Sequence, residues 1–250
     1  MFKYLKISGL LSDINRGEIM SNRKKLVLVI LCIIVNTFLI LGFLFLRNAT
    51  MLNDLKKEAN ILSKLDITKD RYNRKIRTRG DYANVEKTVK TYLDDYAVSL
   101  QKMLGVMTDS KLTQLFSYDN YTNDGPEFKE SIVYLQSAKE EFNLQVDKLL
   151  INSEEDTICA YGKEKIKDNN YYTLYLDMIL NDSMKKQFSD TKEILVQTKT
   201  RTNEVFDISA ELLNFLITNK DSWKLEEGEI RFQTDALYNQ YNLYVSRLSQ

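Results

Sequence analysis

Hydrophobic and polar positions divide the chain into one apolar run and a long amphipathic remainder. Residues 26–46 contain only two polar side chains, Asn36 and Thr37, and neither is charged. A helix of about 20 apolar residues crosses the hydrocarbon core of a bilayer. The run is longer than the ~7–15 apolar residues of a cleaved signal peptide, and Arg47 stands where a cleavage site needs a small residue. The pattern therefore predicts a single retained transmembrane helix over residues 26–46, with the lipid bilayer as its partner.

The charges beside the run predict its direction. Arg23, Lys24 and Lys25 precede it and Arg47 follows it. Basic residues are more frequent on the cytoplasmic side, so residues 1–25 are expected to be a short cytoplasmic tail, with the C-terminal part outside the plasma membrane. The codons for residues 16–19 are compatible with a ribosome-binding site before Met20. Translation from Met1 and from Met20 both stay open, and in the second case residues 1–19 are a mis-assigned start.

The remainder has the spacing of long helices, with 8 Gly and 1 Pro in the whole chain to interrupt them. Apolar residues at helical spacing between 52 and 65 extend the transmembrane helix outward. Further helices are expected over 85–107, from about Pro126 to Asn152, and over 190–219. The clearest apolar stripe consists of Val85, Val89, Tyr92, Tyr96, Leu100, Met103 and Met107. The Asp/Asn-rich segment 118–125 is expected to be a loop, with Asp124 or Gly125 capping the next helix. Residues 81–250 are therefore predicted to be an antiparallel helical bundle.

A short β-hairpin is expected near the C-terminus. A two-residue turn at Glu227-Gly228 would place Leu225 opposite Ile230 and Trp223 opposite Phe232, on one face. A lone hairpin is marginal in water, so its apolar face should cover one end of the bundle. A last helix follows over 234–248. The predicted fold class is mainly α, with one transmembrane helix, an extracytoplasmic bundle and this hairpin.

A basic stretch lies within residues 47–80, which we expect to form a helical stalk between membrane and bundle. Its cations are Lys69, Arg71, Arg74, Lys75, Arg77 and Arg79. They could contact anionic lipid headgroups or a polyanionic wall polymer at the membrane surface. The alternative is a solvated stalk or hinge.

A second candidate is a polar layer in the helix over 190–219. The heptad-like positions there are apolar at both ends and polar in the middle, at Thr198 and Arg201: Ile194, Thr198, Arg201, Val205, Ile208, Leu212 and Phe215. A buried arginine would need a carboxylate or a ligand anion. The alternative is that this helix turns its threonine-rich middle toward solvent.

Composition limits the chemistry. The chain has no His, which excludes histidine-dependent catalytic triads and imidazole metal sites. Cys32 lies inside the apolar run and Cys159 outside it, so they cannot form a disulfide with each other. Residues 120–131 do not fit the calcium-loop scheme, because Ser131 stands where the closing Glu belongs. We expect no catalytic, cofactor-binding or metal-binding residues.

Residues 48–250 contain 28 basic and 33 acidic residues, which gives no reason to expect nucleic acid as a partner. The abundance of Lys, Asn, Ile and Tyr is typical of an AT-rich, Gram-positive genome. The expected function is that of a non-enzymatic, membrane-anchored protein that binds or scaffolds an envelope protein or anionic wall polymer. A sensor ectodomain acting through a separate membrane partner is an alternative, and a carboxylate-based envelope enzyme is a third class.

Overall fold

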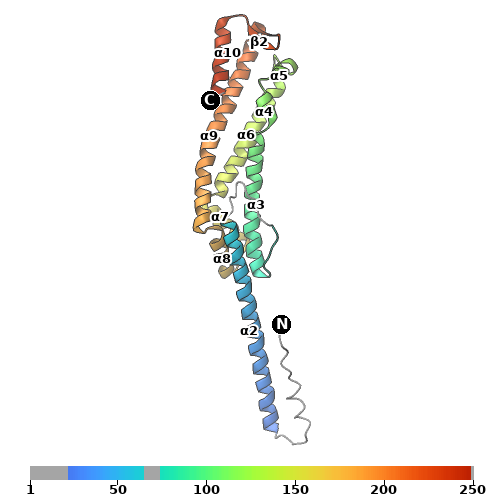
Figure 1. The fold of residues 1–250 in the computed structure, drawn as a ribbon, viewed down its shortest axis with the longest axis vertical. Helices are drawn as coiled ribbons and strands as arrows, with labels where there is room; N and C mark the ends of the chain where they lie inside the picture. The colour runs from blue at the N-terminus through green and yellow to red at the C-terminus, as the bar shows by residue number, and fades with distance from the viewer. Residues whose placement is uncertain (1–21, 65–73, 249–250) are drawn as a thin grey trace. The chain divides into compact units, whose positions relative to one another are not determined.

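The computed structural model describes residues 22–64 and 74–248. The chain is mainly helical, with one small antiparallel sheet near the C-terminus (Figure 1). It divides into two units, residues 1–53 and residues 54–250. Helix α2, Asn22–Leu62, contributes residues to both. The predicted tail up to residue 21, including both candidate start sites, lies outside the described residues.

The first unit consists, in its described part, of the N-terminal portion of α2. Its described large apolar side chains up to Leu46 are exposed, namely Val35, Leu39, Ile40, Leu41, Phe43 and Leu46. Among the described residues, this is the one helix long and apolar enough to cross a membrane. An α2 that runs on to Leu62 also confirms the predicted extension of the helix beyond the apolar run.

The second unit is a bundle of three long helices: α3 (Asp81–Met107), α6 (Lys129–Asn152) and α9 (Asp182–Thr218). Helix α6 packs against both α3 and α9. Polar contacts between α6 and α9 join Lys139 to Asp207 and Asp147 to Lys199, so the two helices are antiparallel. Between these pairs, Asn143 and Asn203 exchange side-chain hydrogen bonds of 2.9 Å in each direction, which fixes the register of the two helices.

Shorter helices complete the bundle (Figure 1). Those that pack on a long helix are α8 (Asn169–Ile179) against α3, and α10 (Asp235–Leu248) against α9. The connecting helices are α4 (Ser110–Gln114), α5 (Tyr118–Asn123), α7 (Glu155–Lys165) and the short 3-10 turn η2 (Lys220–Ser222).

Most of the predicted stripe on α3 is confirmed. Its members from Val85 to Met103 are buried, whereas Met107 at the end of the helix is exposed. The prediction for α9 was less accurate, because Ile194 and Val205 are exposed and Leu195 and Phe206 beside them are buried. Helix α9 begins at Asp182, eight residues before the predicted start. Its buried face therefore includes Met184 and Phe188, which the predicted boundary left out.

The predicted loop at 118–125 is partly helical. Ser117 caps α5 by accepting a hydrogen bond from the Asn120 amide. Asp124 accepts hydrogen bonds from the amides of Glu130 (3.0 Å) and Ser131 (2.7 Å) in the first turn of α6, although the N-cap residue of that helix is Phe128. Its oxygens thereby satisfy backbone donors at a helix start.

The hairpin has the predicted register. Strands β1 (Trp223–Glu226) and β2 (Glu229–Phe232) place Trp223 opposite Phe232 and Leu225 opposite Ile230. Both turn residues, Glu227 and Gly228, have positive φ, as a type I′ turn requires. The Trp223 ring stacks on Phe128, and its Nε1 donates to the Leu216 carbonyl at 2.9 Å. The hairpin therefore covers this end of the bundle, as predicted.

A glycine sets how closely α7 approaches α8. A Cβ at Gly162 would lie 2.1 Å from Cε1 of Tyr175, which is buried and donates a hydrogen bond to the Ile158 carbonyl. Gly162→Ala should therefore destabilise the fold by about 1–3 kcal/mol, even though Ala favours helix. Gly105→Ala is the matched control, because nothing lies within 4 Å of its Cβ position, and it should stabilise α3 by about 0.5–1 kcal/mol. Chemical denaturation of the full chain in detergent would measure both changes. Equal effects would mean that Tyr175 moves aside freely.

Candidate functional site

The structure separates the six predicted cations by what they contact. Lys69 and Arg71 lie outside the described residues. The segment 74–80, which carries the other four, contains neither helix nor strand, so this part of the predicted helical stalk is not helical. Lys75 and Arg79 have exposed side chains. Arg74 and Arg77 are also exposed in part but pair with carboxylates of the bundle: Arg74 Nε lies 2.8 Å from Asp94 Oδ1, and Arg77 Nε lies 3.3 Å from Glu58 Oε2.

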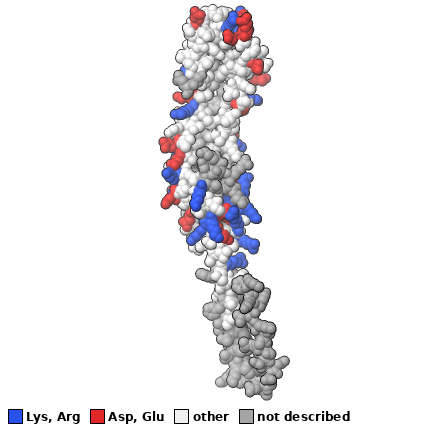
Figure 2. All heavy atoms as spheres, viewed as in Figure 1, with Lys and Arg blue, Asp and Glu red and all other residues white. Residues whose placement is uncertain are grey.

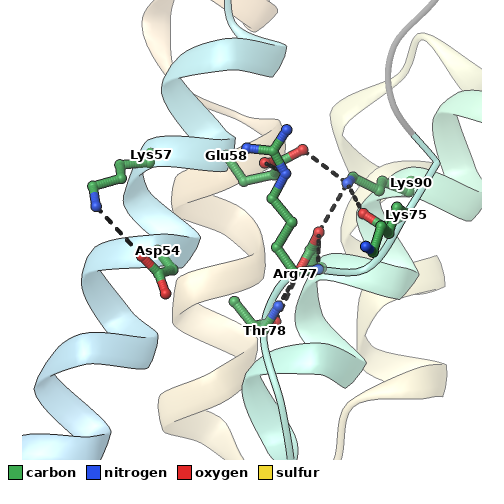
Figure 3. A network of polar contacts seen from close by, with 8 residues as sticks. Asp54, Lys57, Glu58, Lys75, Arg77, Thr78 and Lys90 are labelled. Carbon is green, nitrogen blue, oxygen red and sulfur yellow. Dashed lines mark hydrogen bonds and ion pairs between the residues drawn. The ribbon is translucent and has the colours of Figure 1, made fainter.

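The Arg77 contact belongs to a buried charged network centred on Lys90 (Figure 3). Glu58, Glu86 and Lys90 are 1%, 0% and 3% exposed. Lys90 Nζ donates to Glu58 Oε1 and Glu86 Oε1, both at 2.8 Å, and to the Lys75 carbonyl at 2.9 Å. Its three donors therefore have acceptors on α2, on α3 and in the segment 74–80.

Glu86 is held from its other side by the same segment. Its carboxylate accepts hydrogen bonds from the amides of Arg77 and Thr78 at 2.9–3.0 Å and from the Thr78 hydroxyl at 2.8 Å. Burial alone would raise the pKa of Glu86. The hydrogen bonds from Lys90, Thr78 and Arg77 outweigh that effect and hold its pKa below the ordinary value of 4.5.

Helical spacing explains how these groups meet. Leu55, Glu58 and Leu62 are spaced by three and four residues, so they share one face of α2, and all three are buried. Glu86 and Lys90 are four residues apart on α3, beside the buried Val85 and Val89. Each charge thus sits inside an apolar stripe of its own helix. This placement is the only signal in the sequence that could have indicated their burial.

The compact unit that contains this network begins earlier in the chain than we predicted. We expected a stalk over 47–80 and a domain from 81 onward. Residues 54–64 and 74–80 instead belong to the same unit as the bundle. The Ser63 carbonyl also accepts hydrogen bonds from Ser183 at 2.7 Å and Gln187 at 3.3 Å on α9. These residues are therefore parts of the bundle, because their apolar and charged side chains complete its core.

The second candidate, the polar layer at Thr198 and Arg201, does not form. Arg201 is exposed and Thr198 is half-buried. Helix α9 turns the middle of this segment toward solvent, which is the alternative considered above. The buried side chain in this part of α9 is Leu195, one residue from the predicted Ile194.

Buried paired carboxylates would favour the enzyme class only if they lined a hollow. Glu58 and Glu86 are paired with Lys90 and Arg77 in a network that contains two negative and two positive side chains. The four hollows described on the bundle have volumes of about 230–410 Å³, and other residues line them. Within the described residues, no group of three or more Asp, Glu or Cys side chains could hold a metal ion.

Comparison with known proteins gives no match to a family model, to a curated protein or to a solved structure.

We expect Lys90 to be essential to the stability of the fold. Among the described residues, Lys90→Met leaves Arg77 as the charged partner of two buried carboxylates, so we expect a loss of about 3–5 kcal/mol in unfolding free energy. Lys87→Met is the matched control, because Lys87 is exposed on the same helix and should change stability by less than about 0.5 kcal/mol. Denaturation in urea would measure both. A loss below about 1 kcal/mol for Lys90→Met would show that water reaches the carboxylates.

Glu86 should make the fold sensitive to acid. A carboxyl group with a lowered pKa in the folded chain stabilises the fold above 4.5, and this contribution is lost as the pH falls through the lowered pKa. Glu86→Gln should therefore be less stable at neutral pH, and its unfolding free energy should fall less on acidification than that of the wild type. Glu229→Gln, at an exposed position, should keep the wild-type pH dependence. Parallel curves for wild type and Glu86→Gln would contradict the assignment.

Proposed function

We propose that this chain is a single-pass protein of a Gram-positive plasma membrane, with a cytoplasmic N-terminus and an extracytoplasmic bundle that binds or scaffolds an envelope partner without catalysing a reaction. The observation that carries the proposal is the exposed apolar surface of α2. Val35, Leu39, Ile40, Leu41, Phe43 and Leu46 are each 50–66% exposed. Such a continuous apolar surface is unfavourable in water and matches the hydrocarbon core of a bilayer.

The bundle supports the binding part of the proposal. Antiparallel α6 and α9 are joined on their surface by charged pairs and by the Asn143–Asn203 amide pair. The hairpin packs on the end of the bundle through Trp223. Long helices with a register fixed in this way offer an ordered surface to a partner, and binding requires no further chemistry from the chain.

A sensor ectodomain is the second candidate, favoured by the position of Glu58. Glu58 lies on α2, the helix that also carries the apolar run, and it contacts Lys90 on α3 at 2.8 Å. A displacement of the last turns of α2 would therefore disturb a buried ion pair in the bundle. Such a sensor would need a separate membrane partner to carry the signal.

Topology provides the first test. A chain with different epitope tags at its two ends would be expressed in a Gram-positive host, and protease would be added to intact protoplasts. We expect loss of the C-terminal tag and protection of the N-terminal tag, with both lost after lysis. Lys56, Lys57 and Lys64 also follow the run within 20 residues, so charge alone does not decide the direction. Protection of the C-terminal tag would contradict the proposed orientation.

Cross-linking in native membranes, followed by capture of the C-terminal tag, would then test partner binding. A specific envelope partner that contacts the bundle supports the binding proposal. A captured membrane protein with a cytoplasmic signalling domain would instead favour the sensor.

A further inference from the structure

Charge is unevenly distributed along the chain after the apolar run. Residues 48–90 contain 11 basic and 6 acidic residues, whereas residues 91–250 contain 17 basic and 27 acidic residues. The first segment therefore carries a net charge of about +5 and the second about −10. The mild acidity of the whole exterior part conceals a strongly basic segment directly after the apolar run.

Folding makes the exposed surface of residues 48–90 more positive. Of the acidic residues described in the basic segment, Glu58 and Glu86 are buried, Asp54 is half-buried beside Lys57, and Asp81 is exposed. Lys90 is the buried cation of this segment, and its other described lysines and arginines are exposed. In Figure 2, Lys and Arg side chains gather over the lower part of the bundle, and the acidic side chains are more frequent above it. The surface of this segment is thus more positive than its composition indicates.

We propose that the exposed cations of residues 54–79, which include Lys56, Lys64, Lys75 and Arg79, bind the phosphate groups of anionic lipids in the bilayer that holds α2. The inference rests on the proposed membrane anchor. It assigns a binding partner to the predicted basic segment, and it applies to the cations that remain exposed after the fold has formed.

The chain itself favours lipid over a wall polymer as the source of phosphate. Lys56 follows Leu46 by only ten residues of chain. Once the apolar run is inserted, these cations stay at high effective concentration near the headgroups. Each Lys or Arg near an anionic surface contributes about 1 kcal/mol, and the attraction extends over about one Debye length, which is about 30 Å at 0.01 M salt and about 8 Å at 0.15 M.

Lysine footprinting of the full chain in lipid nanodiscs would test the inference. Discs of phosphatidylcholine alone would be compared with discs that contain about 30% phosphatidylglycerol, using an amine-acetylating reagent and mass spectrometry. At low salt we expect acetylation of Lys56 and Lys64 to slow at least threefold in the anionic discs, and the difference to vanish in 0.5 M NaCl because salt screens the attraction. Lys102 and Lys129, which are exposed elsewhere on the bundle, are internal controls and should react equally in both discs.

A pair of variants with equal charge changes sharpens the test. In the double variant Lys56→Glu, Lys64→Glu, we expect Lys75 to lose its protection by phosphatidylglycerol. The control, Lys102→Glu with Lys129→Glu, should keep that protection although its net charge falls by the same amount. Both pairs are exposed, so the melting temperature should stay near that of the wild type.

Each contrary result has a distinct meaning. Failure of the chain to enter either disc would contradict the membrane anchor, and with it the proposed function. Entry into both discs with equal acetylation of Lys56 and Lys64 would overturn the lipid contact alone.

Soluble polyphosphate or inorganic phosphate would be added to phosphatidylcholine discs as separate arms. Protection by polyphosphate without protection by phosphatidylglycerol would assign the surface to a polymer, and equal protection by inorganic phosphate would show non-specific anion binding. Either result would overturn the inference.

Discussion

The structure depends on one buried ammonium group that is shared by two buried carboxylates. Lys90 holds Glu58 of α2 and Glu86 of α3, and its third donor binds a carbonyl in the segment that leads into α3. An ion pair of this kind adds little net stability compared with a well-packed apolar cluster, because removing each charge from water costs several kcal/mol. The network instead makes the packing of α2 on α3 specific. Any other packing that separates Lys90 from Glu58 or Glu86 leaves a buried charge without a partner. The position of the last turns of α2 is fixed by that penalty together with Leu55 and Leu62.

The parts of the fold that follow from local rules could be predicted from the sequence. The stripe on α3 and the register of the hairpin both depend on the spacing of neighbours along the chain, and the structure has them as expected. Glu58 was missed because its partner lies 32 residues away on another helix. Sequence spacing shows that a charge falls within an apolar stripe, but a buried and a solvated charge look alike until the partner is known.

The cations of residues 69–79 also show that the sequence does not reveal which charges have partners in the fold. This run of cations was interpreted as a uniform stalk, since like charges in sequence usually lie in solvent. Arg74 and Arg77 instead contact Asp94 and Glu58, while Lys75 and Arg79 stay exposed. Arg201 was considered for burial because of its heptad position, yet it is exposed. Heptad position alone therefore did not decide which arginine meets a carboxylate, because that carboxylate comes from another element.

The buried network and the exposed basic surface have a common origin. Lys90 and the segment 74–80 hold Glu58 and Glu86 inside the bundle, so burial removes two negative charges and one positive charge from the surface of residues 48–90. If both carboxylates lay in solvent, they would offset two of the neighbouring cations within a few residues of chain. The interaction that positions α2 also leaves the exposed surface of residues 54–79 more positive. Core packing and surface electrostatics are thus coupled through the same two glutamates, although neither can touch a partner outside the chain.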